Sequence, residues 1–514
     1  MLKSTGTGER GTQKGSRARV MVTVAVAGPL IVLVLMCLLQ LRQQFDGVQT
    51  QTTWIGDTPV TVYRPIGASQ MPHEKLPVLV AHGFGGSRQM MEALSSALAR
   101  AGHPVLAFDF IGHGRHPKPL SPQVTQIEGT TRQLVTQTID MLAAARTMFG
   151  AQDAVALLGH SMATDIVVRA ARETGETGPV VAISMYSDAV TQAFPARLLV
   201  ISGQWEPHLR AIALEKLRLV QPGAAENTTV TSPTAERRAV YAPLTEHVGV
   251  LYSPQTLAEA VSWIGGAPAP STGLAATMPR PGLWILGTLA GLWALFWPVS
   301  RLLANDSPAP AAVPARRFIG CALLPALPAG LVLVLPVPAP HDLAIFGPLT
   351  AFFAVWGGLQ LALLRPSSFT LRRIDIGAAC LLLVWSIGVF ALAMDAIWAA
   401  FVPSGPRLAL FGLLTLGTVP FLIADQLLTD RAALWRVWLL RVAPLVTLGA
   451  VMSILPTSLG VGFTVLPVLA LFYLVYGTMG RWVARRAGPT GPALALGIIL
   501  AWSIAASTPL FATD

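Results

Sequence analysis

Hydrophobic and polar positions divide the chain into three unlike parts. One apolar run covers 20–41, further apolar runs fill most of 282–510, and the stretch between them has ordinary polarity. About 20 apolar residues are enough to cross a bilayer, so both apolar parts are predicted to lie in a membrane. The predicted parts are a basic cytoplasmic leader (1–19), a transmembrane signal anchor (20–41), a soluble domain (48–265), a linker (266–281) and a polytopic membrane domain (282–514).

The membrane domain divides at its charged residues and prolines into eight predicted spans, at 282–300, 318–337, 343–364, 375–400, 408–428, 434–455, 460–480 and 490–511. Alternate connections are rich in arginine, namely at Arg301, Arg316, Arg317, Arg365, Arg372, Arg373, Arg431, Arg436, Arg481, Arg485 and Arg486. The other connections hold little beyond Arg407. Because Lys and Arg accumulate in cytoplasmic loops, we expect an integral protein of the cell membrane whose soluble domain lies on the extracytoplasmic side.

The first apolar run has the length of a membrane span. It follows a basic leader and ends in "LLQLRQQF", without the small-residue cleavage site of a secretory signal peptide. We therefore expect an uncleaved signal anchor.

Composition agrees with a membrane protein, because only 12% of the residues are charged, roughly half the usual share. The net charge of +10 comes largely from the arginine-rich connections, which would face anionic lipid. No basic stripe interleaved with aromatics occurs in the soluble part, so membrane lipids and not nucleic acid are the expected partners. Cys37, Cys321 and Cys380 all fall in predicted spans, which predicts no disulfide in the soluble domain.

Short apolar runs alternate with helical stretches along the soluble domain. From residue 48, "VQTQTTWIGDTPVTVYRP" has β-forming residues around Gly56-Asp57, which is a hairpin signal. Runs typical of buried strands follow, and the helical stretches between them lie at 89–101, 130–149, 162–174, 208–220 and 255–264. This order predicts a doubly wound, mostly parallel α/β sheet. In such sheets ligands bind at the carboxyl ends of the strands.

The stretch "DAVALLGHSMATD" (153–165) places Ser161 where a strand reverses into a helix. Gly159 relieves crowding at this turn, and the small side chain of Ala163 keeps its other side clear. The Ser161 hydroxyl would then project above the sheet, in front of a helix amino terminus that favours developing negative charge.

Five stretches in the same order resemble the α/β-hydrolase family, in particular its serine esterase and lipase branch. They are "HGFGGS" (82–87), "FDFIGHGRH" (108–116), "GHSMA" (159–163), "LLVISGQWEP" (198–207) and "EHVGVLYSPQTLAEAVSWI" (246–264). The resemblance covers about 48–265. It departs from the family pattern at Ala163, where glycine is usual, and at His116, where serine is usual.

The resemblance implies a catalytic triad in the chain order serine, acid, histidine. Ser161 would be the nucleophile and His247 the base. Glu206 is the expected acid and Asp188 the alternative, since either could orient the imidazole. The backbone N–H groups of Phe84 and Met162 would form the oxyanion hole. The supporting loop residues are His82, Gly83, Asp109, Gly159 and His160.

These residues predict a membrane-anchored serine hydrolase that cleaves carboxylic esters, including lipid or acyl esters, through an acyl-serine intermediate. The same triad serves amides and thioesters, so a peptidase or a thioesterase is an alternative, as is acyl transfer to an alcohol. Another class is a non-catalytic binding ectodomain on a transporter or signalling protein. No metal or phosphate-loop motif occurs, so no cofactor is expected, and the oligomeric state is left open.

Only "MYSDAVTQAFPA" separates two late strands, which leaves no room for a cap domain over the site. We expect the membrane domain or the bilayer surface to form one wall of the pocket. Asp395 and Asp425 fall near the ends of their spans, and we expect both carboxylates to be solvated at the membrane interface.

Overall fold

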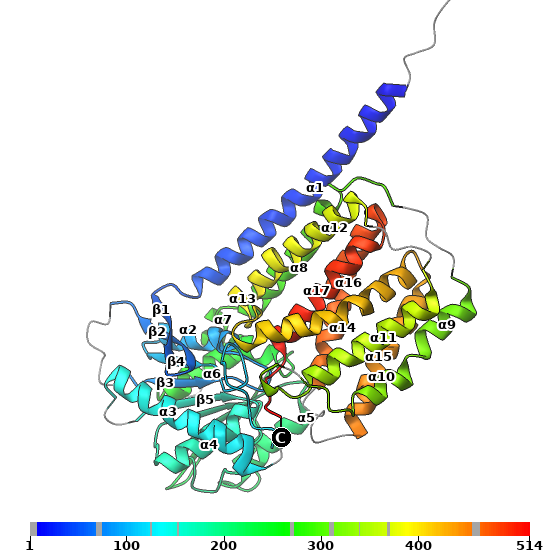
Figure 1. Cartoon of the computed structure of the whole chain (residues 1–514). Coiled ribbons are helices and arrows are strands. Elements are labelled where there is room, and N and C mark those ends of the chain that lie inside the picture. Colours follow the sequence, from blue (N-terminus) through cyan, green and yellow to red (C-terminus); the bar gives the residue numbers. More distant parts are fainter. Residues whose placement is uncertain are drawn as a thin grey trace, which may run out of the picture.

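An α/β domain and a helical domain make up the computed structural model (Figure 1). The structure describes residues 8–67, 75–123, 126–151, 154–267, 272–307, 313–338, 340–366, 371–454 and 463–513. The α/β domain lies against one end of the helical domain. Helix α1 (Gly8–Gln43) runs along the side of that domain and leads directly into the first strand.

A nine-stranded sheet in the order β1-β2-β4-β3-β5-β6-β7-β9-β8 forms the centre of the α/β domain. The strands are β1 (Val48–Ile55), β2 (Thr58–Pro65), β3 (Val78–Ala81), β4 (Val105–Phe108), β5 (Ala156–His160), β6 (Val180–Ile183), β7 (Arg197–Gly203), β8 (Thr228–Thr231) and β9 (Glu236–Ala242). The β1–β2 hairpin, the β2–β4 pair and the β8–β9 pair are antiparallel, and the central pairs are parallel. The predicted sheet is thus confirmed, except that β8 was not predicted.

Alternate residues of the central strands face two separate cores, as the period of two in a strand requires. Leu79 and Leu157 pack under one layer of helices, whereas Val78 and Leu158 pack under the other. The first layer comprises α3 (Arg132–Phe149), α4 (Met162–Thr174) and α5 (Pro207–Arg218). The second comprises α2 (Glu92–Arg100) and α6 (Pro254–Ile264). Such a doubly covered sheet presents the carboxyl ends of its parallel strands at one edge.

The helical domain follows a short helix α7 (Thr272–Thr277). Its helices are α8 (Pro281–Ser300), α9 (Ala315–Leu323), α10 (Ala326–Val332), α11 (Phe346–Leu364), α12 (Arg373–Leu383), the wider-wound η5 (Val384–Ala391), α13 (Leu392–Ile397), α14 (Pro406–Thr429), α15 (Leu434–Ile454), α16 (Val465–Ala487) and α17 (Thr490–Ser507). Across the described residues, nine helical stretches, α1 among them, are long and apolar enough to cross a membrane. Each of the nine predicted spans therefore overlaps one of these helices, although the ends differ by several residues. Residue 455 of one predicted span and residues 460–462 of the next lie outside the described residues.

Helix α1 packs closely on α8 at two glycines one helical turn apart. A Cβ atom added to Gly287 would lie 2.7 Å from the sulfur of Cys37, and one added to Gly291 would lie 2.6 Å from a methyl group of Val34. Small residues four positions apart allow membrane helices to approach this closely. The first span is thus packed against the later ones.

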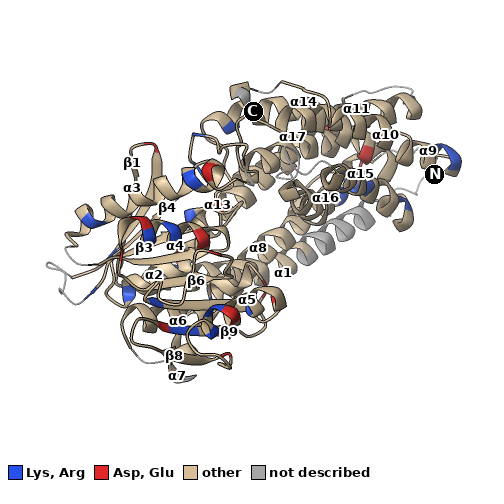
Figure 2. Cartoon of the chain, turned by 90° about the horizontal axis from the view of Figure 1, so that it is seen from below, with Lys and Arg blue, Asp and Glu red and all other residues tan. Residues whose placement is uncertain are grey.

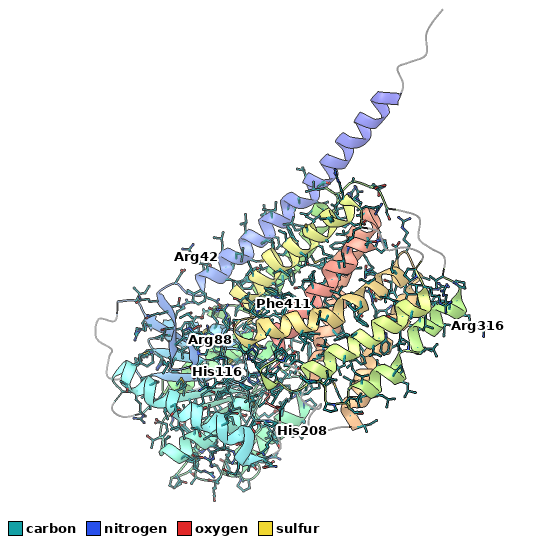
Figure 3. The ribbon with its side chains drawn as sticks, in the orientation of Figure 1. Arg42, Arg88, His116, His208, Arg316 and Phe411 are labelled. Atoms are coloured by element: carbon teal, nitrogen blue, oxygen red, sulfur yellow. The ribbon has the colours of Figure 1, made fainter. Side chains whose placement is uncertain are left out.

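The arginine-rich connections lie at the end of the helical domain opposite the α/β domain. Arg301 follows α8 and Arg486 lies in the last turn of α16, and the Arg486 guanidinium donates to the Arg301 carbonyl at 3.3 Å. Figure 3 shows Arg316 at this far end, remote from His208 in the α/β domain. In Figure 2 the charged residues colour the α/β domain and the far loops, whereas the helices between them are mostly tan.

The last residues of the chain join the two domains. Leu510 N–H donates to the Gly112 carbonyl at 2.8 Å, and Leu120 N–H donates to the Leu510 carbonyl at 2.8 Å. The ring of Phe511 packs into the core of the α/β domain. At the start of α14, the buried Arg407 guanidinium also donates to the Gly112 carbonyl, at 3.1 Å.

The expectation that Asp395 and Asp425 are solvated is wrong. Asp395 forms an ion pair with Arg115 of the α/β domain and accepts the N–H groups of Phe401 and Val402 at 2.9 and 3.1 Å. Asp425 is buried and pairs with Arg441 of α15 at 2.9 Å. Asp395 gains a cation from the other domain and Asp425 gains one from the next helix, and a cation at hydrogen-bond distance replaces solvation.

Candidate active site

Ser161 occupies a sharp turn between β5 and α4. Its backbone has φ 52° and ψ −119°, a strained conformation for a residue with a side chain. A Cβ atom added to Gly159 would lie 2.7 Å from the Ala163 carbonyl oxygen, so glycine is required there. The Ala163 methyl group is fully buried without displacing the turn, which explains how alanine replaces the more usual glycine.

His247 and Glu206 complete a hydrogen-bonded chain that begins at Ser161. The Ser161 hydroxyl donates to His247 Nε2 at 2.9 Å, and His247 Nδ1–H donates to Glu206 Oε1 at 2.6 Å. His247 lies in the loop after β9, and Glu206 lies just before α5. An imidazole held in this tautomer can accept the proton of the hydroxyl that faces it.

Glu206 is buried, and three donors surround its carboxylate. Besides His247, the Ser184 hydroxyl donates to Oε2 at 2.7 Å and Gly203 N–H donates to the same oxygen at 2.5 Å. Burial alone would raise the pKa of this carboxyl. The hydrogen bonds from His247, Gly203 and Ser184 outweigh it and lower the pKa below its usual value.

The structure does not bring Asp188 to His247. Its side chain is 82% exposed and pairs with Arg169 on the surface of α4. Of the two acids considered from the sequence, only Glu206 contacts the imidazole.

Two further histidines hold the loops around Ser161. His160 Nε2–H donates to the His247 carbonyl at 2.9 Å. His82 Nδ1–H donates to the Gly83 carbonyl at 2.7 Å, and its Nε2 accepts Phe110 N–H at 3.0 Å. Burial lowers the pKa of both rings, that of His160 to about 4. Both are therefore neutral supports at pH 7.

Asp109 braces the loop after β4 from a fully buried position. Its carboxylate pairs with Arg88, and it accepts the backbone N–H groups of Arg88 and Arg115 at 2.8 and 3.0 Å. Gly114 has φ +52°, and an added Cβ atom would meet this carboxylate at 2.4 Å. His113 and His116 are also buried in this loop, and burial lowers their pKa to about 3 and about 4. Together with His82 and His160 they form a group that we call the four buried histidines.

The Phe84 and Met162 amides lie in the two segments that flank Ser161. Within the described residues, neither N–H group has a hydrogen-bond partner. The two segments can approach this closely because Gly83 has no side chain. An added Cβ atom would lie 2.8 Å from His160 Nδ1 and 3.1 Å from Ser161 Cβ. Two free donors beside a hydroxyl suit a developing oxyanion.

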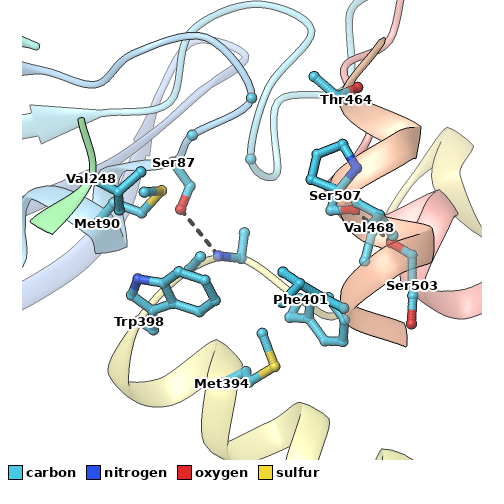
Figure 4. A pocket seen from close by; sticks show the side chains of 18 of the residues that line it. Ser87, Met90, Val248, Met394, Trp398, Phe401, Thr464, Val468, Ser503 and Ser507 are labelled. Carbon is cyan, nitrogen blue, oxygen red and sulfur yellow. Dashed lines mark hydrogen bonds between the residues drawn. The ribbon is translucent and has the colours of Figure 1, made fainter. Parts of the chain in front are cut away.

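A cavity of about 740 Å³ opens in front of Ser161 and His247. One wall comes from the α/β domain and the other from the helical domain, as Figure 4 shows for Met90 and Val248 facing Met394 and Val468. Where the domains meet, the Ala400 N–H donates to the Ser87 hydroxyl at 3.0 Å. The expectation that the membrane domain forms one wall of the pocket is confirmed.

Residues 77–183 match the family model described as alpha/beta hydrolase fold. The α/β domain has this fold. Among solved structures, the chain is similar to a CIB-like hydrolase from Thermoplasma acidophilum (14% identity, 43% of this chain and 98% of that chain covered, TM-score 0.33). It is also similar to a Pyrobaculum calidifontis esterase (16% identity, 51% of this chain and 94% of that chain covered, TM-score 0.31). A third similar structure is a membrane phospholipase A described as a bacterial virulence factor (14% identity, 50% of this chain and 98% of that chain covered, TM-score 0.31). No curated protein matches the chain significantly.

The α/β domain, which we now call the hydrolase-fold domain, also contains contacts that the sequence did not reveal. Ser87 and Arg115 each bond to the helical domain, far along the chain, and Ser184 bonds to the catalytic acid Glu206. Ser184 directly follows a buried strand and has φ 52°, so its position at a strand end was the only available signal. Across the described residues, no cluster of three or more His, Cys, Asp or Glu side chains could hold a metal ion.

Proposed function

We propose that the protein is a membrane-anchored serine hydrolase that cleaves carboxylic esters through an acyl-Ser161 intermediate. The observation that carries this proposal is the chain of hydrogen bonds from the Ser161 hydroxyl through His247 to Glu206. This chain stands at a strained strand–helix turn that faces a large cavity. A hydroxyl becomes a good nucleophile when a correctly oriented base takes its proton.

The reaction runs in two halves. As Ser161 Oγ attacks the ester carbonyl carbon, its proton moves to His247 Nε2, and the Phe84 and Met162 amides stabilise the oxyanion. The bond to the alcohol oxygen then breaks, and the imidazolium gives its proton to that oxygen. In the second half a water molecule attacks the acyl group through the same base, and the carboxylic acid leaves as Ser161 Oγ regains a proton.

Labelling with a fluorophosphonate tests the nucleophile. We expect wild-type protein in detergent to be labelled at Ser161, Ser161→Ala to remain unlabelled, and His247→Ala to react far more slowly. His208→Ala is the matched control, because His208 is an exposed histidine of the same domain, and it should label at the wild-type rate. A folded wild type that resists the probe would instead support a binding ectodomain. Comparing an ester with the matching anilide and thioester separates the peptidase and thioesterase alternatives.

We also propose that the hydrolase-fold domain faces the extracytoplasmic side, with α1 retained as an uncleaved signal anchor. The arginine-rich ends on the opposite side of the helical domain support this orientation, and the close packing of α1 on α8 supports its retention. In intact cells, a membrane-impermeant maleimide should label Thr234→Cys on the hydrolase-fold domain but not Arg316→Cys at the far end; both positions are exposed. Labelling of Arg316→Cys alone would reverse the orientation.

A further inference from the structure

The cavity in front of Ser161 continues into the helical domain between α8 and α16. Leu289 and Trp293 line it from α8, and Val468 and Phe472 line it from α16. The catalytic groups Ser161 and His247 lie at the other end, and the helical side is mostly apolar, with a few hydroxyl groups such as those of Ser503 and Tyr476. The cavity is therefore amphipathic along its length, with the reactive hydroxyl at its polar end.

The far end of the cavity is closed by aromatic side chains. Trp293 Nε1–H donates to the Val475 carbonyl at 3.3 Å, which ties α8 to α16. Tyr476 packs edge-on against Phe390, with ring centroids 5.6 Å apart, and both residues line the cavity. From Thr464, beside the loop that contains Gly85, to Tyr476, α16 rises by about 18 Å. One leaflet of a bilayer core is about 15 Å thick, so the cavity has the length of a lipid tail.

Part of the cavity wall lies at the surface of the membrane-spanning helices, and we take this part as its mouth. Three leucines that line it remain largely exposed: Leu286 of α8 (66%) and Leu471 and Leu474 of α16 (54% and 65%). They lie about 7 to 14 Å along their helices from the ends next to the hydrolase-fold domain. At that depth exposed leucines contact acyl chains and not water, so we expect the cavity to open into the bilayer between the first halves of α8 and α16.

We propose that this cavity binds the acyl chain of a membrane lipid ester, which enters sideways from the bilayer between α8 and α16. The proposal rests on the proposed function, since it assigns the substrate class of the same serine. The tail lies along α16 with its end against Tyr476 and Phe390, and the ester carbonyl lies at Ser161. The helical domain is then the acyl-binding site of the enzyme as well as its anchor.

An alkyl fluorophosphonate with a diazirine at the end of a long chain tests this placement in protein reconstituted in vesicles. The phosphonate first labels Ser161, and light then attaches the chain end to whatever lies beside it. We expect peptides that cover 286–293 of α8 or 468–476 of α16 to carry the cross-link. A cross-link to the exposed surface of the hydrolase-fold domain, for example near Tyr186, would overturn the acyl site while leaving the serine assignment intact. Failure to label Ser161 would instead overturn the proposed function, and this proposal with it.

A matched pair of variants tests the mouth. Leu286→Trp places a bulky ring in the opening, whereas Leu283→Trp makes the same change on the same helix at an exposed leucine outside the cavity. Each methylene that the cavity buries should raise kcat/KM by about fourfold, so wild type should strongly prefer a decanoate over a butyrate ester. We expect Leu286→Trp to lower the decanoate-to-butyrate ratio at least tenfold and Leu283→Trp to change it less than twofold. Equal ratios in the two variants would refute the sideways entry.

Discussion

Glu206→Gln is expected to lower kcat/KM for a soluble ester by about 10³- to 10⁴-fold without unfolding the protein. The side chain keeps its size and its buried position. What changes is the hydrogen bonding around it, because a carboxylate accepts at both oxygens whereas an amide accepts at only one.

The magnitude follows from the three donors that meet this carboxylate. If the amide oxygen faces Ser184 and Gly203, the amide NH₂ faces His247 Nδ1, which can then only accept. The imidazole proton moves to Nε2, where it faces the Ser161 hydroxyl and prevents that nitrogen from taking the serine proton. The opposite orientation sets the NH₂ against the Ser184 and Gly203 donors. A loss of this size corresponds to about 4 to 5.5 kcal/mol of activation free energy.

The assay is steady-state hydrolysis of a chromogenic butyrate ester, with thermal unfolding in detergent as the check on folding. Asp188→Asn is the matched control, since that carboxylate contacts Arg169 on the surface, and its kcat/KM should stay within about twofold of wild type. A Glu206→Gln variant with near wild-type activity, or a large loss in Asp188→Asn, would refute the assignment of the acid.

Three further predictions concern the supporting structure. Gly83→Ala should lower kcat/KM about 100-fold by displacing the oxyanion loop. Gly412→Ala, in open space on α14, should leave kcat/KM unchanged, and equal activities of the two variants would contradict the close approach of Gly83 to Ser161. Asp395→Ala leaves the N–H groups of Phe401 and Val402 without their acceptor and should lower the free energy of unfolding by at least about 2 kcal/mol. Arg115→Gln should lower it less, because it removes only a partly exposed partner. Because the pKa of each of the four buried histidines lies below its unfolded value, the unfolded chain takes up protons first, so stability should fall as pH drops from about 6.5 towards 4. His160→Gln should flatten that slope in calorimetric scans, and an unchanged slope would contradict its neutral state.

The sheet and the position of Ser161 could be predicted because local sequence determines them. Short apolar runs separated by helical stretches predict a doubly wound, mostly parallel sheet, and a glycine two residues before the serine marks the turn. The sequence left Glu206 and Asp188 open, because both follow strands whose ends meet at the same edge of the sheet. The three-dimensional course of the loops decides between them, and it turns Asp188 towards Arg169.

Contacts between the domains could not be predicted, because they join elements remote in sequence. Nothing near Asp395 indicates that Arg115 of the other domain lies opposite. Within the helical domain, the sequence around Asp425 likewise does not show that Arg441 of the next helix faces it. The apolar spans were predicted, but a sequence of leucines does not show which of them face a cavity. The cavity that α8 and α16 line depends on how those helices pack, which the sequence does not show.

Trapping the covalent intermediate most directly tests the claim that Ser161 accepts an acyl group. Wild-type protein mixed with an activated ester and quenched within milliseconds should gain the mass of one acyl group, located by peptide mass spectrometry on the segment that contains Ser161. The adduct should be absent from Ser161→Ala. An adduct that persists in Ser161→Ala at the same rate, or ester turnover by that variant at the wild-type rate, would contradict the account.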